Sequence, residues 1–379
     1  MGEIYGGHLA ARYLKEVEGV DTVFTLSGGH IQRILDGFND YSIRAIDVRH
    51  EQAAAMMAHA WSIYTGKPGV CLVTAGPGFT NSLTGVVNAY LDNAPLVVLS
   101  GRSPLRDDLK GSLQEMNQVD MIKPVVKWCG TCYETKRIPE YLAIAFTHAV
   151  EGRPGPVFLE LPPDILNVKV AEESACIPVR ASRKFKFHPD DEALKAAAAL
   201  IDRAEKPVFV GGSGVLFSRC EVALAAFLEK TGMPFQLLNH SRGVLPDDHP
   251  LSIAEGGFTG IMLALTQADL IVSAGVRFNW QFQFGTLFPK AKLVRIDIDP
   301  CEIDRNRCAD VGLCGDVGSV LTHLTPLVKK AEHSRWLTDL RQAGQAFNAS
   351  ELKLRETVSH PIHPIRLVAQ LQKAVGEDA

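Results

Sequence analysis

A single glutamate stands where a predicted strand meets a predicted helix. Glu51 follows Arg49 and His50 at the carboxyl end of the strand expected over 44–48, and it opens the helix expected over 51–64. A carboxylate in the first turn of a helix is stabilised by the helix dipole. Apolar packing behind it also suits it to exchange a proton with a ligand in a dry pocket. Glu51 is therefore either a proton carrier or a first-turn acid that only stabilises its helix.

Two further loops follow predicted strands at the same edge of the sheet. Residues 74–81 read TAGPGFTN, in which glycines let the backbone approach a ligand closely and Pro77 stiffens the turn. Residues 27–30 read SGGH, and their last residue, His30, is either a site residue or a helix cap. Ligands of open α/β sheets bind at the carboxyl ends of the strands, so three such loops together predict a site there.

The second half of the chain carries weaker signals for a nucleotide. Residues 211–214 read GGSG after a predicted strand, which lacks the third glycine of a dinucleotide fingerprint. Asp297 ends a later predicted strand, where a carboxylate can accept ribose hydroxyl groups, and Arg277 follows another strand. These positions predict a nucleotide-shaped ligand; the alternative is a Rossmann-like domain kept for packing alone.

Short β-branched runs alternate with longer helical patterns through the first 170 residues. Such alternation predicts βαβ crossovers and a mostly parallel, doubly wound sheet that helices cover on both faces. The helix expected over 51–64 is apolar nearly all round and should therefore be buried. The expected elements are helices over 6–18, 30–38, 51–64, 79–91 and 138–150, and strands over 22–26, 44–48, 69–74, 95–100 and 156–161.

The same alternation restarts at Pro189 and predicts a second doubly wound α/β domain. The sequence divides into a first domain over 1–170, a linker over 171–188, a second domain over 189–330 and a tail over 331–379. The tail ends in a helical pattern with no strand after it, so we expect the first helix of a third domain whose remainder is absent. The expected elements are helices to about 204 and over 219–231, 257–267, 334–357 and 365–375, and strands over 207–211, 234–238, 269–274 and 292–298.

The composition excludes several classes of protein. The 379 residues are 46% hydrophobic and 22% charged with a formal net charge of −4, so there is no basic footprint for nucleic acid or an anionic membrane. No apolar run approaches the roughly 18–20 residues that a membrane-spanning helix needs. The start of the sequence has neither a basic leader nor an apolar core, and we expect a cytoplasmic protein.

The eight cysteines are too few for a disulfide scaffold. Cys129 and Cys132 have the spacing of a redox loop, but they extend a strand-like run instead of opening a helix. We therefore expect them to be reduced structural residues. Cys301, Cys308 and Cys314 lack the paired spacing of a zinc site, and no metal site is predicted.

Four motifs in order resemble one protein family. They are RHEQ at 49–52, TAGPGFTN at 74–81, GRPGPV at 152–157 with LPPD at 161–164, and GVRFNW at 275–280. Together they are similar to the thiamine-diphosphate-dependent superfamily of acetolactate synthase, benzaldehyde lyase, oxalyl-CoA decarboxylase and 2-hydroxyacyl-CoA lyase. The resemblance covers essentially the whole chain. It implies a pyrimidine-binding domain followed by a central nucleotide-binding domain.

The resemblance also implies roles for residues of the first domain. In the family, the glutamate that matches Glu51 hydrogen-bonds the ring nitrogen of the cofactor's aminopyrimidine and promotes loss of the thiazolium proton. By the same matching, Gly78 and Asn81 line the pyrimidine pocket, while His30 and Gln114 face the substrate. The family binds the diphosphate and Mg²⁺ in a third domain that this sequence lacks. That absence implies a fragment, a partner chain that supplies the rest, or a non-catalytic module.

The resemblance implies three functions. RFNW at 277–280 is similar to oxalyl-CoA decarboxylase and 2-hydroxyacyl-CoA lyase, whose central domain holds ADP rather than FAD, whereas GGHI at 28–31 resembles benzaldehyde lyase and acetolactate-synthase-like enzymes. We expect a 2-hydroxyacyl-CoA lyase, with an acetolactate synthase-like or benzaldehyde lyase-like carboligase acting on 2-oxo acids or aldehydes as the alternative. A non-catalytic ADP-, CoA- or FAD-binding module is the alternative of another class.

The resemblance further implies a homodimer or homotetramer. Its candidates for the nucleotide site are Arg153, Gly212, Ser213, Arg277 and Asp297.

Overall fold

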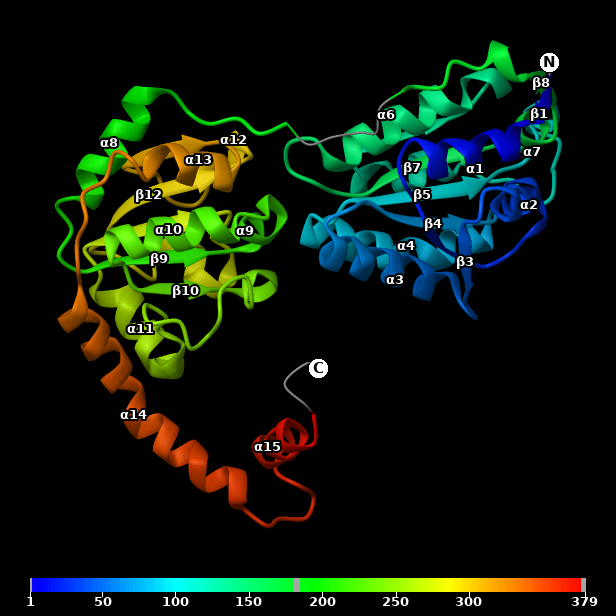
Figure 1. The fold of residues 1–379 in the computed structure, drawn as a ribbon. Coiled ribbons are helices and arrows are strands. Elements are labelled where there is room, and N and C mark those ends of the chain that lie inside the picture. The colour runs from blue at the N-terminus through cyan, green and yellow to red at the C-terminus, as the bar shows by residue number, and fades with distance from the viewer. Residues whose placement is uncertain (1, 180–184, 376–379) are drawn as a thin grey trace. The chain divides into compact units, whose positions relative to one another are not determined.

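The chain forms two compact units, each built on one main parallel sheet (Figure 1). The computed structural model describes residues 2–179 and 185–375. The first unit ends at Phe185 and the second begins at Lys186. The linker expected over 171–188 includes residues 180–184, which lie outside the described residues.

The first unit contains a six-stranded sheet in the order β3-β2-β4-β5-β7-β6. Each strand pairing is parallel, so the carboxyl ends of all six strands meet at one edge. Its central strands are rich in Val and Leu because helices bury both of their faces. The strands are β2 (Thr22–Thr25), β3 (Arg44–Asp47), β4 (Gly69–Val73), β5 (Leu96–Gly101), β6 (Trp128–Thr131) and β7 (Val157–Leu161).

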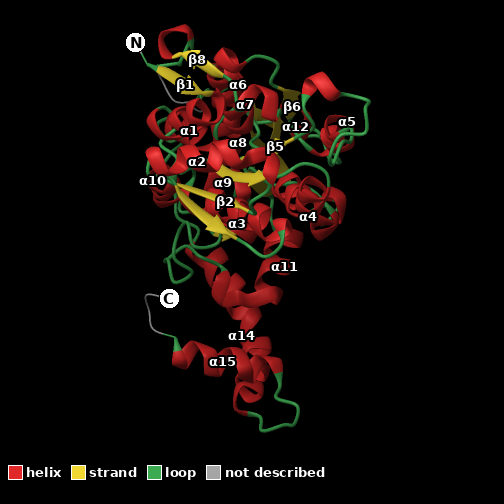
Figure 2. Cartoon of the chain, turned by 90° about the vertical axis from the view of Figure 1, so that its right-hand side faces the viewer, coloured by secondary structure: helices red, strands yellow, loops and turns green. Residues whose placement is uncertain are grey.

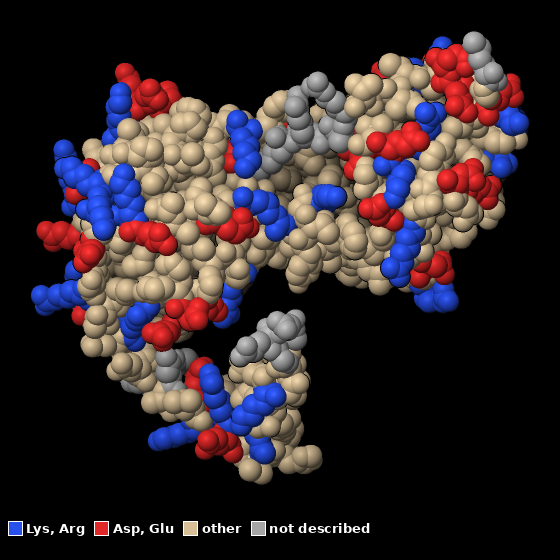
Figure 3. Space-filling view, in the orientation of Figure 1, with Lys and Arg blue, Asp and Glu red and all other residues tan. Residues whose placement is uncertain are grey.

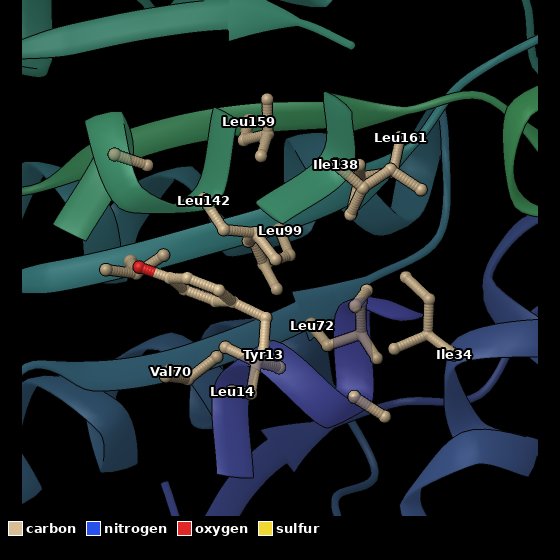
Figure 4. Packing of buried hydrophobic residues seen from close by; sticks show 14 of the residues in the cluster. Tyr13, Leu14, Ile34, Val70, Leu72, Leu99, Ile138, Leu142, Leu159 and Leu161 are labelled. Carbon is tan, nitrogen blue, oxygen red and sulfur yellow. The ribbon is translucent and has the colours of Figure 1, made fainter. Parts of the chain in front are cut away.

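Helices cover both faces of this sheet. Helices α1 and α6 pack together on one face, and α3 and α4 pack together on the other (Figure 1). Figure 4 shows the core under α1 and α6, where Tyr13 and Leu142 meet Leu99 of the sheet. The helices are α1 (Gly6–Glu16), α2 (Gln32–Asp40), α3 (Glu51–Thr65), α4 (Pro77–Asp92), α5 (Gln118–Ile122), α6 (Ile138–Val150) and α7 (Pro163–Leu166).

The expectation that α3 is buried is correct for only one of its sides. Ala54, Ala55 and Ala58 are fully buried against α4 and the sheet, but Met57 is 44% exposed and Trp61 is 39% exposed. The apolar pattern of the helix requires a cover on each side. The first unit supplies a cover on one side alone, and an apolar strip is left at the surface of the unit.

Two short elements of the first unit do not follow the alternating pattern. Strand β1 (Glu3–Tyr5) pairs antiparallel with β8 (Lys169–Ala171) in a separate two-stranded sheet.

Cys129 lies in β6 and Cys132 follows that strand, and both are free thiols. Burial raises the pKa of the Cys132 thiol to about 11 and also raises the pKa of Cys129, so both favour the unreactive thiol form expected of structural residues.

The second unit contains a five-stranded parallel sheet in the order β10-β9-β11-β12-β13. Buried residues of α8, α10 and α13 form the core on one face, and those of α11 and α14 form it on the other. The sequence pattern predicts neither β13 nor α13. The strands are β9 (Pro207–Gly211), β10 (Phe235–Leu237), β11 (Leu270–Ala274), β12 (Lys292–Asp297) and β13 (Val311–Cys314); the helices are α8 (Asp191–Ile201), α9 (Ser213–Ser218), α10 (Glu221–Thr231), α11 (Gly257–Gln267), α12 (Pro300–Ile303) and α13 (Val317–Leu324).

Two helices follow the second sheet. α14 (Ser334–Glu356) is anchored at its start by Trp336, whose Nε1 donates a hydrogen bond to the carbonyl oxygen of Pro207 at 3.2 Å. α15 (Pro364–Ala374) packs on α14, and Figure 2 shows the pair as helices without an accompanying strand. Several apolar side chains of α15 are exposed, among them Leu371 at 52%.

Both units therefore have the doubly wound α/β fold that the sequence predicts. In the described part of the chain, none of the helices combines the length and the hydropathy needed to cross a membrane. Acidic and basic side chains alternate over the face of each unit drawn in Figure 3. That mixture agrees with the small net charge of −4.

Candidate active site

Four loops lie at the carboxyl edge of the first sheet. The loop after β2 carries His30, the loop after β3 leads into Glu51, and the loop after β4 is the glycine turn at 74–78. β2 lies between β3 and β4 in the sheet, so these three loops are neighbours. The loop after β5 carries Gln114 and joins them from the other side of β4.

Glu51 is a buried carboxylate with a defined partner. It is the first residue of α3 and is 7% exposed. His50 caps the helix by accepting a hydrogen bond at Nδ1 from the Gln52 backbone N–H at 3.2 Å, which fixes where α3 begins. From α4, Asn81 donates from Nδ2 to Glu51 Oε2 at 2.9 Å. The carboxylate is therefore held at a helix N-terminus, where the helix dipole favours its charge.

Gly78 keeps the second oxygen of this carboxylate uncovered. A Cβ at Gly78 would lie 3.3 Å from Glu51 Oε1 and 2.6 Å from Thr74 Cγ2. A Cβ at Gly28 would lie 2.6 Å from Thr74 Oγ1, so glycines also let the loop after β2 reach the same threonine. Thr74 therefore joins two of the loops, and a side chain at position 78 would crowd Glu51.

His30 lies over the ends of β4 and β5. It is 8% exposed, and its Nδ1 lies 3.1 Å from Thr74 Oγ1. Gly101 ends β5 directly beneath it, because a Cβ there would overlap the Cβ of His30. Burial lowers the pKa of His30 below its usual value of 6.5, and a hydrogen bond with the Leu113 backbone opposes part of this shift. His30 is therefore neutral at pH 7 and can both donate and accept a proton.

Gln114 lies in the same group through its backbone. Its φ angle is +57°, and a Cβ at Gly76 would lie 2.8 Å from the Gln114 Cβ. The neighbouring Leu113 backbone bonds to His30. The structure thus brings Glu51, His30, Gly78, Asn81 and Gln114 to one edge of one sheet.

Sequence reasoning does not identify two buried residues below this edge. Gln118, at the start of α5, accepts at Oε1 from the Gly76 N–H at 2.9 Å and donates from Nε2 to Glu160 Oε1 at 2.8 Å. Glu160 also accepts from Thr131 Oγ1 at 2.6 Å. A carboxylate within the apolar strand β7 is the one signal in the sequence that could have pointed to this network.

Gly212 and Gly214 of the second unit pack mainly against backbone. Gly212 follows β9, and a Cβ there would lie 3.0 Å from Val276 Cα and overlap the Gly275 carbonyl oxygen. A Cβ at Gly214 would lie 2.7 Å from Gly275 Cα. Ser213 opens α9, which has six residues. These glycines allow two loops to pack closely. Such packing is what the alternative of a Rossmann-like domain kept for packing alone predicts for this motif.

The remaining nucleotide-site candidates lie in different places. Asp297 ends β12, is 7% exposed, and accepts at Oδ1 from the Asp299 N–H at 3.0 Å. Burial raises the pKa of Asp297 to about 6. Arg277 follows β11 and is half-buried. Arg153 belongs to the first unit, where its Nε donates to Asn93 Oδ1 at 2.6 Å beside the end of α4.

Both units match domains of one enzyme family. Residues 4–121 match the thiamine pyrophosphate enzyme N-terminal TPP binding domain, and residues 194–324 match the thiamine pyrophosphate enzyme central domain. An acetolactate synthase large subunit of Mycobacterium tuberculosis is 34% identical over 383 residues, which cover 99% of this chain and 68% of that protein. The chain belongs to the thiamine pyrophosphate enzyme family.

Other thiamine pyrophosphate enzymes with similar sequences carry related names. A probable acetolactate synthase large subunit of Methanocaldococcus jannaschii is 32% identical over 372 residues. The alignment covers 96% of this chain and 62% of that protein. The chloroplastic acetolactate synthase of Arabidopsis thaliana is 33% identical, with 94% of this chain and 55% of that protein covered. The chain thus spans between about half and two thirds of the length of these relatives. Their names support the acetolactate synthase-like alternative and not the expected 2-hydroxyacyl-CoA lyase.

The residues of the first unit fit the pyrimidine part of the family's cofactor. Glu51 is a buried carboxylate whose Oε1 is left uncovered by Gly78, and such an oxygen can accept a hydrogen bond from a protonated ring nitrogen. Among the residues that the structure describes, no group of three or more His, Cys, Asp or Glu side chains is placed to hold a metal ion.

Proposed function

We propose that this chain provides the pyrimidine-binding and central domains of an acetolactate-synthase-type carboligase. The reaction joins two molecules of pyruvate, takes up one proton and releases one carboxyl group as CO₂. Bound thiamine diphosphate supplies the carbanion chemistry of such a reaction. The observation that carries the proposal is Glu51, a buried carboxylate held by Asn81 and left open on the side of Gly78.

Glu51 has the position of a group that exchanges a proton with the aminopyrimidine ring. Its Oε2 is fixed by the Asn81 amide, so only Oε1 is available to a ring nitrogen. A carboxylate in a water-poor pocket makes a stronger hydrogen bond than one in water. Gly78 and Asn81 are proposed to line the pyrimidine pocket beside Glu51.

His30 and Gln114 are proposed to face the substrate. His30 is buried and neutral at pH 7 because burial lowers its pKa, so it can hold or release a proton at a carbonyl or carboxylate oxygen of a 2-oxo acid. Thr74 fixes its ring orientation through Nδ1. The half-buried Gln114 amide can donate to the same class of oxygen.

A second copy of the chain is proposed to cover the apolar strip on α3. This strip consists of Met57 and Trp61, which are 44% and 39% exposed. Exposed apolar patches of this kind mark interaction surfaces. Sedimentation of wild type and Trp61→Arg tests this proposal. A wild-type monomer, or an arginine variant that assembles as wild type does, would contradict it.

The second unit is proposed to bind a nucleotide such as ADP or FAD at Asp297. The support is its position at the carboxyl end of β12, next to the end of β11, where doubly wound sheets bind nucleotide hydroxyl groups. Calorimetric titration with ADP and FAD tests it, using Asp297→Ala as the variant that should lose binding. The assignments of Gly212, Ser213, Arg277 and Arg153 to this ligand stay predictions.

Product measurement tests the main proposal. The protein produced from its natural gene is incubated with thiamine diphosphate, Mg²⁺ and pyruvate, and acetolactate and CO₂ are measured. We expect equal amounts of the two products. Cleavage of benzoin or of a 2-hydroxyacyl-CoA without any acetolactate would contradict the proposal and restore one of the other two enzyme functions.

A further inference from the structure

We propose that Gln118 and Glu160 are positioning residues that hold the Gly76 turn, and through it the Gly78 and Asn81 side of the Glu51 site. Neither side chain belongs to the four motifs of the family resemblance. Both are buried, with 1% and 3% exposure. The inference rests on the proposed function for its effect on turnover, whereas its effect on the turn can be measured without a substrate.

The Gln118 amide uses both of its N–H groups and its oxygen in this network. Its Oε1 accepts from the Gly76 N–H at 2.9 Å, and its Nε2 donates to the Gly101 carbonyl oxygen at 2.9 Å and to Glu160 Oε1 at 2.8 Å. Gln118 thus ties the turn after β4 to the carboxyl ends of β5 and β7. Two buried strands fix this side chain, and the side chain fixes one loop.

Gly76 needs such a fixed partner because of its backbone conformation. Its φ and ψ are +58° and −116°, a combination that L side chains rarely adopt, and it caps α4 without any side-chain hydrogen bond of its own. Its N–H is buried and would be left without a partner if Gln118 moved away. The hydrogen bond therefore stabilises the turn at its most constrained residue.

The turn connects this network to the site. Gly76 is followed by Pro77 at the start of α4, then by Gly78 beside Glu51 Oε1 and by Asn81, whose amide holds Glu51 Oε2. A displacement of Gly76 moves the first turn of α4 as a unit, because Pro77 is stiff. Gln118 therefore positions both groups that contact the Glu51 carboxylate from α4.

Glu160 keeps the Gln118 amide in its orientation. Because its two oxygens accept from Gln118 and Thr131, the Gln118 nitrogen must point to Glu160 and its oxygen must point to Gly76. Arg102 Nη1 lies 3.9 Å from Glu160 Oε2 and compensates its charge. Cys129 of β6 is another titratable group beside it; burial, opposed by Lys123, raises the pKa of this thiol, and Asp120 and Glu160 raise it further.

The variant Gln118→Glu tests the inference through its pH dependence. The new carboxyl group keeps the oxygen that accepts from Gly76, but its other oxygen faces the Glu160 carboxylate and the Gly101 carbonyl oxygen. At pH 5.5 the two carboxyl groups can share one proton and keep the contact, whereas at pH 8.5 both are ionised and repel each other. We expect hydrogen exchange in a peptide over 74–81 to be near wild type at pH 5.5 and about tenfold faster at pH 8.5, each relative to wild type at the same pH.

Two further variants keep this test decisive. Gln342→Glu adds the same charge on the exposed surface of α14 and should leave exchange over 74–81 unchanged at both pH values. The double variant Gln118→Glu with Glu160→Gln removes the repulsion between two carboxylates and leaves only the contact with the Gly101 carbonyl oxygen, so its pH dependence should be much smaller. A pH dependence as large as that of Gln118→Glu alone, or loosening spread evenly over the whole first unit, would overturn the inference.

The turnover of Gln118→Glu separates this inference from the proposed function. If exchange over 74–81 responds as expected and wild type forms no acetolactate, the proposed function fails and the network is retained. If wild type forms acetolactate and the loosened turn leaves both turnover and its pH profile unchanged, Gln118 does not position the site. We expect turnover to fall at alkaline pH in parallel with the loss of exchange protection.

Discussion

Both units place a glycine turn at the carboxyl edge of a parallel sheet, but the two turns meet different partners. In the first unit, Gly78 lies against the side chains of Thr74 and Glu51, and Gly76 lies against the Cβ and backbone of Gln114. In the second unit, Gly212 and Gly214 lie mainly against the backbone of residues 275–276. The same residue type therefore keeps a carboxylate uncovered in one unit and allows two backbones to touch in the other. A glycine-rich turn identifies a close approach, and only its partner tells whether the turn serves a site.

The buried carboxylates of the two units also differ in the groups that donate hydrogen bonds to them. Glu51 and Glu160 each accept a hydrogen bond from a side-chain amide, provided by Asn81 and Gln118 respectively. Asp297 accepts from a backbone N–H, and burial raises its pKa to about 6. A charged group is stable inside a protein when donors surround it. The first unit therefore gives its buried carboxylates side-chain donors, whereas in the second unit burial favours the neutral form of Asp297.

The largest expected effect is the loss of activity on Glu51→Gln. The amide keeps the shape of the side chain but cannot exchange a proton with a ring nitrogen, so turnover should fall by about 10²–10⁴-fold. Thermal unfolding should change little, because Asn81 can still bond to the amide oxygen. Acetolactate formation measures the effect, with Glu140→Gln on the surface of α6 as the control. Full activity of Glu51→Gln would show that the reaction does not need the Glu51 carboxylate, and the first unit would then have no functional carboxylate to set against Asp297.

Gly275→Ala should destabilise the second unit whether or not a ligand binds there. Gly275 has a φ angle of +59°, and a Cβ there would lie 2.7 Å from Gly214 N and overlap Gly214 Cα. We expect a loss of about 3 kcal/mol or more in the free energy of unfolding. Gly152 has the same φ of +59° with nothing within 4 Å, so Gly152→Ala isolates the conformational part and should cost about 1–2 kcal/mol. Equal losses in urea unfolding would show that the close packing is not what Gly275 provides.

Asp297→Asn should stabilise the second unit at neutral pH. The folded pKa of about 6 lies above the ordinary value of 3.8, so the stability that the neutral carboxyl contributes is fully present below pH 3.8 and is lost as the pH rises through 6. Asparagine keeps the acceptor for the Asp299 N–H without this titration. We expect the variant to be more stable than wild type by about 2–3 kcal/mol at pH 8 and equal to it near pH 4. Urea unfolding at the two pH values measures the difference, and an equal gain at both would show that the carboxylate charge is not its cause.

Long periodic elements were predictable from the sequence, and paired contacts were not. The pattern predicts α6 and α11 at their observed bounds, because an apolar face of eleven to thirteen residues repeats at helical spacing. It misses β13, whose four residues VGLC carry no clear alternation. It also treats α3 as buried, because an apolar side chain reads the same whether its own unit or another molecule covers it.

The residues of the candidate site also divide into those that the sequence predicts and those that it does not. Glu51 and the glycine turn at 74–78 are predictable because each follows a strand directly. Gln118 is not, since its partners Gly76 and Glu160 are each 42 residues away in the sequence and only the order of strands in the sheet brings them together. Sequence spacing therefore predicts which loops form the edge, and the sheet decides which side chains hold them.

The smallest expected effect separates two asparagines of α4. Asn81→Ala removes the amide that holds Glu51 Oε2, and a hydrogen bond to a charged group at a partly exposed position contributes about 1–1.5 kcal/mol. We expect thiamine diphosphate to be needed at about tenfold higher concentration for half-maximal activity. Asn88→Ala, two turns along the same helix, removes an amide that lies 3.4 Å from His59 Nδ1 and should change this concentration less than about twofold. If both variants behaved alike, Asn81 would act through the stability of α4, and the donor that distinguishes Glu51 from Asp297 would have no part in cofactor binding.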